Sequence, residues 1–214
     1  MNIAVCTIDR SPGPNYVHST LAHLSHLPKI TLHVGNSDTR YVADLPFPKV
    51  TLPPFDLQHP AQLLAENFLA IANYYSSAYL YCEDDIEPCS SFHVHLNRAI
   101  RICELLSSSA PYILTLFCPQ PLPRSGPLAQ LEPAGSFGTV CLYVPTQSIQ
   151  VCKDAYAMYK THKYIGQGID IALRKLRVPI YTTNPSLVQH IGHISTGCSG
   201  TPAQVYSPSF RKNV

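Results

Sequence analysis

Residues 78–88 read AYLYCEDDIEP, an aromatic and aliphatic run that ends in three consecutive carboxylates. A short apolar run bounded by turn-forming residues predicts a buried strand. The alternation of a strand places Glu83 and Asp85 on one side and Asp84 on the other. Three adjacent acids repel one another, so a divalent cation on one side and a polar ligand on the other would satisfy this geometry. The alternative interpretation is a solvated strand end with surplus acids.

The first part of the chain predicts a strand, a helix and a second strand. Residues 3–8 form an apolar run, residues 16–24 place apolar side chains on one helical face, and residues 30–34 alternate. This order favours an α/β fold with parallel strands. Ligands of such sheets bind beyond the carboxyl ends of the strands. Five polar residues stand there: Thr7, Asp9, Arg10, Asn36 and Asp38.

The rest of the chain continues this alternation without a repeat or an obvious domain boundary. Helices are predicted from Pro60 to about Tyr75, from Ser90 or Ser91 to about Leu106, over residues 147–160 and from Gly168 onward. Strands are predicted over residues 112–117, 139–144 and 178–181, and the tail from Thr182 is predicted to be irregular. We therefore expect a single α/β domain over residues 1–214, with a mixed, mostly parallel sheet flanked by helices.

The composition describes a compact globular protein, with 45% hydrophobic and 13% charged residues. A formal net charge of +2 is too small to indicate a nucleic-acid partner by itself, although a local patch can still be basic. The eight cysteines contain no C-x-x-C pair, and several lie inside apolar runs, which suits a reducing compartment. No signal-peptide pattern and no membrane-spanning apolar run is found, so we expect a cytoplasmic protein without a membrane partner.

The acidic strand end is the strongest candidate metal site. Oxygen ligands at such a position suit Mg²⁺ or Mn²⁺, which retain waters and bind through substrate phosphates. A site with one or two protein carboxylates therefore implies a phosphate-bearing partner. His190 in the tail could complete the site, and an imidazole ligand would favour manganese. His93 and His95 are two residues apart on a predicted helix, so they do not face each other and make a poor metal pair.

Asp170 is a candidate general base. It follows a Gly-x-Gly segment by two residues, in the first turn of a predicted helix, where the macrodipole stabilises a carboxylate. Arg174 stands four residues further on and forms a favourable helical pair. The helix dipole and the pairing with Arg174 are enough to explain an aspartate at position 170 by helix stability alone. The functional alternative is that Asp170 removes a proton from an acceptor hydroxyl. The glycine segment lacks the third glycine of a dinucleotide fingerprint, and the chain has no Walker motif.

Four segments follow one another in a recognisable order: residues 16–24 (YVHSTLAHL), 83–86 (EDDI), 135–138 (GSFG) and 185–192 (PSLVQHIG). They resemble glycosyltransferases of the GT-A fold, in particular the N-acetylglucosaminyltransferase IV group. In that group the helix reads Y-L-x-x-T-L-x-S-L, the metal motif reads E-D-D-I and the late segment reads P-S-L-F-Q-H-V-G. The resemblance implies a GT-A fold and a nucleotide-sugar diphosphate that is chelated by a metal ion.

The resemblance also implies a role for each acid. Asp85 and His190 would hold Mn²⁺ or Mg²⁺, Asp84 would contact the ribose of a UDP-sugar, and Glu83 would support the site through water. Asp170 would be the base that activates the acceptor, with inversion at the sugar. The donor pocket would include Thr7, Arg10, Asn36, Asp38, Asn67 and Gly138. Residues 1–90 would then form the nucleotide-sugar-binding half, and residues 91–214 the acceptor half with the metal-binding tail.

The acceptor and two other function classes stay open. The chain is much shorter than the glycan-processing enzymes, so the acceptor could equally be a protein, a glycan, or a hydroxymethylated base in viral DNA. A DNA acceptor would need a basic groove and a flipped base. The available cations are Lys163, Arg174, Lys175, Arg177, Arg211 and Lys212. The alternatives are a non-catalytic sugar-nucleotide or glycan-binding module with a relict site and, more weakly, a nucleotidyltransferase.

Overall fold

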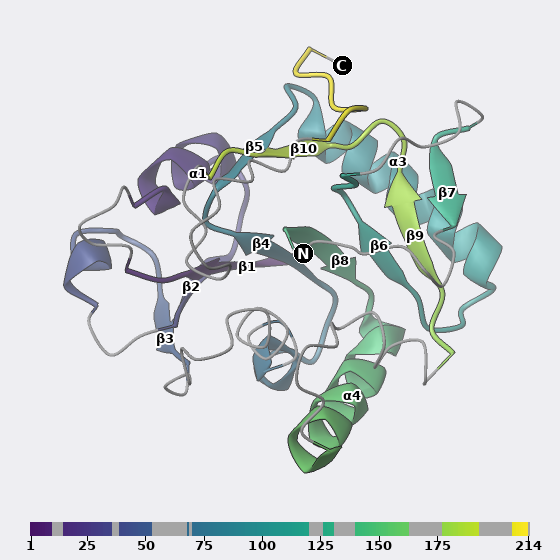
Figure 1. Cartoon of the computed structure of the whole chain (residues 1–214), viewed down its shortest axis with the longest axis horizontal. Helices are drawn as coiled ribbons and strands as arrows, with labels where there is room; N and C mark the ends of the chain where they lie inside the picture. The colour runs from purple at the N-terminus through teal and green to yellow at the C-terminus, as the bar shows by residue number, and fades with distance from the viewer. Residues whose placement is uncertain are drawn as a thin grey trace.

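A computed structural model of the chain describes residues 1–9, 15–35, 39–52, 68, 70–119, 126–130, 140–162, 177–192 and 207–213. Within these residues, eight strands form one sheet in the order β3-β2-β1-β4-β8-β6-β9-β7. Two further strands, β5 and β10, form a small second sheet, which lies above the central strands of the first in the view of Figure 1.

The large sheet contains β1 (Asn2–Thr7), β2 (Ile30–Val34), β3 (Lys49–Thr51), β4 (Tyr79–Glu83), β6 (Ile113–Thr115), β7 (Leu128–Gln130), β8 (Cys141–Val144) and β9 (Ile180–Thr183). The small sheet pairs β5 (Ile86–Pro88) with β10 (Val188–His190). The described helices are α1 (Val17–Leu24), α3 (Phe92–Ser107) and α4 (Ile149–His162), with 3₁₀ turns η1 (Arg40–Val42), η2 (Ala72–Tyr74) and η3 (Thr146–Ser148).

The sheet is mixed and mostly parallel, as the sequence predicts. The pairs β1–β2, β1–β4, β2–β3 and β6–β9 are parallel, and β4–β8, β6–β8 and β7–β9 are antiparallel. Cys6 pairs with Glu83 in the parallel ladder between β1 and β4. Thr7 at the end of β1 and Glu83 at the end of β4 therefore reach the same edge of the sheet.

Helices cover both faces of the sheet, so its central strands are buried on both sides (Figure 1). Leu80 and Cys82 of β4 belong to the core that includes α1 and α3, whereas Tyr79 and Tyr81 belong to the core that includes α4. This alternation is the one predicted for residues 78–88. The strand ends at Glu83, and Asp84 and Asp85 follow in a bend before β5.

The sequence predicts an irregular tail from Thr182, and this prediction is wrong. Instead β9 continues to Thr183, and residues 188–190 form β10. A strand of three residues is too short to show a periodic pattern. Its register is set by pairing with β5, about a hundred residues earlier in the chain.

The last described segment of the chain holds β10 in place. Ser207 Oγ donates to Ser186 Oγ at 2.7 Å, and the backbone N–H of Ser207 donates to Gln189 Oε1 at 2.9 Å. The backbone N–H of Ser90 donates to the Lys212 carbonyl at 2.9 Å. These bonds tie the chain on both sides of the small sheet to one C-terminal segment.

Three other expectations concern the cysteines, membrane spans and two predicted helices. The seven cysteines in the described ranges are buried and form no disulfide with one another. No helix of the described residues is long and apolar enough to cross a membrane. The helix predicted from Gly168 and most of the one predicted from Pro60 lie outside the described residues, although Phe68 and Ile71 at the end of the latter are fully buried.

His33 in β2 is a buried histidine that stays neutral. Its Nε2 lies 3.0 Å from the Tyr75 hydroxyl, and its Nδ1 has no hydrogen-bond partner within the described residues. Burial lowers the pKa of His33 from 6.5 to about 4. The folded protein therefore binds a proton at His33 only well below the pH at which the unfolded chain does.

We predict that His33 makes the protein less stable as the pH falls from about 6.5 to about 4, because only the unfolded chain then gains the proton. Replacing His33 by Gln should remove up to about 3 kcal/mol of this loss across the interval. Urea unfolding at several pH values between 4.5 and 7.5 measures the slope. His23→Gln, an exposed substitution on α1, is the control and should keep the wild-type slope. Parallel pH profiles for wild type and His33→Gln would contradict the prediction.

Candidate metal and nucleotide site

Three side chains with oxygen and nitrogen donors meet at the end of β4. One ligand atom each from Glu83, Asp85 and His190 lies within 4.8 Å of the others. His190 Nε2 is 3.1 Å from Asp85 Oδ2. Asp85 is buried, whereas Glu83 and His190 are half-buried. The cluster is therefore shielded on the protein side and reachable from outside.

The small sheet brings His190 to the acidic strand end. His190 pairs with Ile86 in the antiparallel ladder of β5 and β10. The backbone N–H of Ile191 donates to the Asp85 carbonyl at 2.8 Å. The main chain of the tail thus bonds directly to the residue whose side chain faces His190, so the meeting of the two side chains follows from backbone pairing.

Gly192 completes this arrangement because it has no side chain. A Cβ built at residue 192 would collide with the Asp85 carboxylate and would also crowd His190 Cε1 at 3.2 Å. The backbone of the tail can approach the carboxylate this closely only with glycine at this position. The sequence showed Gly192 only as part of the resembling segment 185–192.

Asp84 is held by a partner outside the cluster of Glu83, Asp85 and His190. Thr7 Oγ1 donates to Asp84 Oδ2 at 2.5 Å, and Asp84 is buried. Thr20 of α1 donates to the Asp84 carbonyl at 2.7 Å, and its hydroxyl oxygen accepts from the N–H of Ile86 at 3.1 Å. Thr7 holds the carboxylate and Thr20 holds the backbone around it, so Asp84 has a fixed orientation.

Tyr41 of η1 is a residue of this site that the sequence analysis missed. Its buried hydroxyl contacts the Thr7 side chain without a hydrogen bond of good geometry to any described residue, and it feels the charges of Asp84 and Asp9. Burial raises the pKa of Tyr41 and the carboxylate of Asp84 raises it further, while the contact with Thr7 lowers it. Tyr41 therefore presents a protonated hydroxyl beside Asp84. It stands in an irregular stretch, where no periodic pattern marks it.

The donor set of the cluster fits a divalent cation. Two carboxylates and one imidazole are ligands that Mn²⁺ accepts, and Mg²⁺ accepts the oxygens. Ligand atoms around an octahedral ion of this size lie about 3 to 4.3 Å apart, because each is about 2.1 Å from the metal. The 4.8 Å spread of the three ligand atoms is close to that range. Small side-chain rotations suffice to bind an ion.

The structure brings together five of the predicted site residues: Thr7, Glu83, Asp84, Asp85 and His190. They divide into a cluster with metal-binding donors and a buried pair between Thr7 and Asp84. The other predicted site residues lie outside the described part of the chain and stay predictions. These are Arg10, Asn36, Asp38, Asn67, Gly138 and Asp170.

Comparison with known proteins supports the fold. No family model and no curated protein matches the chain. Among solved structures, a candidate glucose-1-phosphate thymidylyltransferase from Bacillus anthracis aligns with a TM-score of 0.52 at 9% identity, over 91% of this chain and 92% of that one. A glycosyltransferase involved in glycosylation of the major capsid of PBCV-1 aligns with a TM-score of 0.47 at 12% identity, over 86% of this chain and 83% of that one.

The first of these alignments shows that the chain shares the fold of that candidate thymidylyltransferase. At such low identity they say nothing about the reaction. They also give no support to the narrower resemblance to the N-acetylglucosaminyltransferase IV group.

We predict that Gly192→Ala lowers the affinity for Mn²⁺ at least tenfold, because the added methyl group displaces the Asp85 carboxylate. Titration with Mn²⁺, followed by calorimetry or by the electron paramagnetic resonance of the free ion, measures the affinity. Asp85→Asn serves as the reference for loss of the site. Thermal unfolding must show that Gly192→Ala is still folded. Wild-type affinity in a folded Gly192→Ala variant would contradict this role of the glycine.

Proposed function

We propose that this chain is a metal-dependent glycosyltransferase that moves a sugar from a UDP-sugar to an acceptor hydroxyl, with inversion. The observation that supports it most is the cluster of Glu83, Asp85 and His190 beside the buried pair of Thr7 and Asp84. The cluster offers a divalent cation to a diphosphate, and the pair offers a fixed carboxylate to sugar hydroxyls. Both stand at one end of the parallel strands β1 and β4, where ligands of such sheets bind.

Each described residue has a separate role in this proposal. Asp85 and His190 hold the cation, and Glu83 supports it through water. When bound, the cation neutralises charge on the departing diphosphate. A carboxylate has several acceptor positions, so Asp84 accepts from Thr7 and from ribose hydroxyls at the same time. Because Thr7 and Thr20 fix Asp84 before the donor arrives, little rotational freedom is lost on binding.

The remaining roles rest on residues outside the described ranges. Asp170 removes the proton of the acceptor hydroxyl as it attacks the anomeric carbon. The donor pocket is completed by Arg10, Asn36, Asp38, Asn67 and Gly138. The acceptor is a protein, a glycan or a hydroxymethylated base in viral DNA.

The decisive experiment separates sugar transfer from the two alternatives by its products. The full chain is incubated with Mn²⁺, a panel of sugar nucleotides and candidate acceptors that include hydroxymethylated DNA. A glycosyltransferase releases UDP and adds the mass of one sugar to the acceptor. A parallel incubation contains a nucleoside triphosphate and a sugar phosphate, from which a nucleotidyltransferase instead forms a sugar nucleotide and pyrophosphate. A binding module retains the nucleotide unchanged, and this outcome, or activity that EDTA leaves unchanged, would overturn the proposal.

We predict that Asp170→Asn reduces kcat at least a hundredfold and leaves donor affinity unchanged, because the amide cannot accept the proton. Initial rates of UDP release at saturating donor and acceptor measure kcat, and calorimetry with UDP measures binding. Asp154→Asn, an exposed substitution on α4, is the control and should keep wild-type kcat. If Asp170→Asn turns over at the wild-type rate, the base is another residue.

We also predict that Tyr41→Phe weakens UDP binding about three- to tenfold, the loss expected for one hydrogen bond. The substitution removes only the hydroxyl beside Thr7 and Asp84. Calorimetry with UDP in the presence of Mn²⁺ measures the effect. Tyr112→Phe is the matched control, since it removes another buried hydroxyl that lies against Tyr143 and Tyr181. Equal UDP affinities for the two variants would contradict a role of Tyr41 in the pocket.

A further inference from the structure

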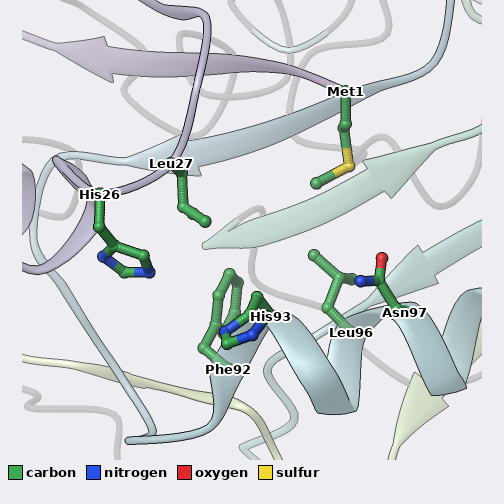
Figure 2. A pocket seen from close by; sticks show the side chains of 7 residues that line it. All are labelled: Met1, His26, Leu27, Phe92, His93, Leu96 and Asn97. Carbon is green, nitrogen blue, oxygen red and sulfur yellow. The ribbon is translucent and has the colours of Figure 1, made fainter.

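A second pocket lies apart from the acidic cluster, between the start of β1, the end of α1 and the first turns of α3 (Figure 2). Its volume is about 380 Å³. It is lined by Met1, His26, Leu27, Phe92, His93, Leu96 and Asn97. The side chains of Phe92 and Leu96 are buried and form an apolar floor, whereas His26, His93 and Asn97 are exposed.

This pocket shares no lining residue with the proposed donor site. Met1 immediately precedes β1, and Thr7 of the donor site is its last residue. A strand of six residues spans about 20 Å, at about 3.3 Å per residue. The two sites therefore stand at opposite ends of β1, and a ligand in one does not contact the other.

Two histidines from different elements face each other in this pocket. His26 follows α1 and His93 is the second residue of α3, and their ring centroids are 6.4 Å apart at an interplanar angle of 72°. Figure 2 shows the imidazole of His26 on the segment after α1 and that of His93 at the start of α3, next to Phe92. Both rings are exposed, so a solvated ion can reach them.

The core holds the two histidines in this relation. Leu24 at the end of α1 and Phe92 and Leu96 of α3 belong to the same buried cluster, which fixes the end of α1 beside the start of α3. On α3, residue 97 is four positions after His93 and shares its face, whereas His95 is two positions on and points elsewhere. The spacing in the sequence makes His93 and His95 a poor pair of metal ligands. The structure supplies His26 as a different partner.

We propose that His26 and His93 form a binding site for a borderline divalent transition-metal ion, with Zn²⁺ as the probe. An imidazole nitrogen binds zinc at about 2.0–2.1 Å, so two rings at a tetrahedral ion have centroids about 5–5.5 Å apart. The observed separation of 6.4 Å is about 1 Å larger, and rotation of the two exposed side chains closes this difference. Imidazole ligands suit Zn²⁺, Ni²⁺ and Cu²⁺, whereas the carboxylate-rich cluster of Glu83 and Asp85 suits Mg²⁺ and Mn²⁺.

The pocket has room for the rest of a coordination shell. Each water of that shell needs about 30 Å³, a small part of the 380 Å³ available. Asn97 adds a carbonyl oxygen on the same face of α3 as His93. Waters and this amide can complete four-coordination around two imidazoles.

Zinc titration of the full chain, followed by calorimetry and by the imidazole NMR signals, tests the site. Each of the variants His26→Gln and His93→Gln should lower the affinity of one zinc site at least tenfold and should abolish the zinc-induced shift of the remaining partner ring. These two histidines, like the control residues His23 and His95, lie outside the core, so each variant is expected to fold.

The matched controls are His23→Gln on α1 and His95→Gln on α3, the neighbouring histidines of the same two elements. Both should bind zinc as the wild type does. The variant Asp85→Asn separates the two metal sites, since it should lose Mn²⁺ and keep the zinc signals of His26 and His93. The proposal is overturned if His26→Gln or His93→Gln retains wild-type zinc affinity, or if all four histidine variants lose affinity alike.

Discussion

The candidate site depends on the pairing of β5 with β10. This ladder lays the tail against the acidic strand end, and the bond from the Ile191 N–H to the Asp85 carbonyl fixes the distance between them. The side chain of His190 then meets the Asp85 carboxylate as a consequence of backbone register. An acid as deeply buried as Asp85 is costly unless it is compensated. The tail places the imidazole of His190 beside this carboxylate, and the two side chains together offer ligand atoms for a cation.

The rest of the scaffold supports this contact from several sides. Parallel pairing of β1 with β4 places Thr7 beside Asp84, and α1 contributes Thr20 to the backbone that connects β4 to β5. The C-terminal segment bonds to β10 through Ser207 and to the chain after β5 through Lys212. Elements that are distant in sequence thus converge on three consecutive acids. Such convergence restricts the motion of each carboxylate, which is what a site for a charged ligand requires.

The two metal-binding arrangements differ in chemistry and in construction. The acidic cluster is built on a strand end and a backbone ladder, and it is rich in oxygen donors. The histidine pair is built on the ends of two helices that a shared apolar core holds side by side. Oxygen-rich ligands suit Mg²⁺ and Mn²⁺ and imidazoles suit Zn²⁺, so different ions are the appropriate probes of the two arrangements.

The sequence by itself determined a buried strand that ends at the three acids and the mixed, mostly parallel α/β fold. These features follow from the spacing of apolar residues, which recur every two residues in a strand and every three to four in a helix, and a single sequence displays this spacing. Only the tertiary structure decided that residues 188–190 form a strand, that Gly192 touches the Asp85 carboxylate, and that Tyr41 and His26 belong to sites. Each of these depends on a contact between segments that lie far apart in the chain. Such a contact is set by strand pairing and core packing, and it leaves no local pattern in the sequence.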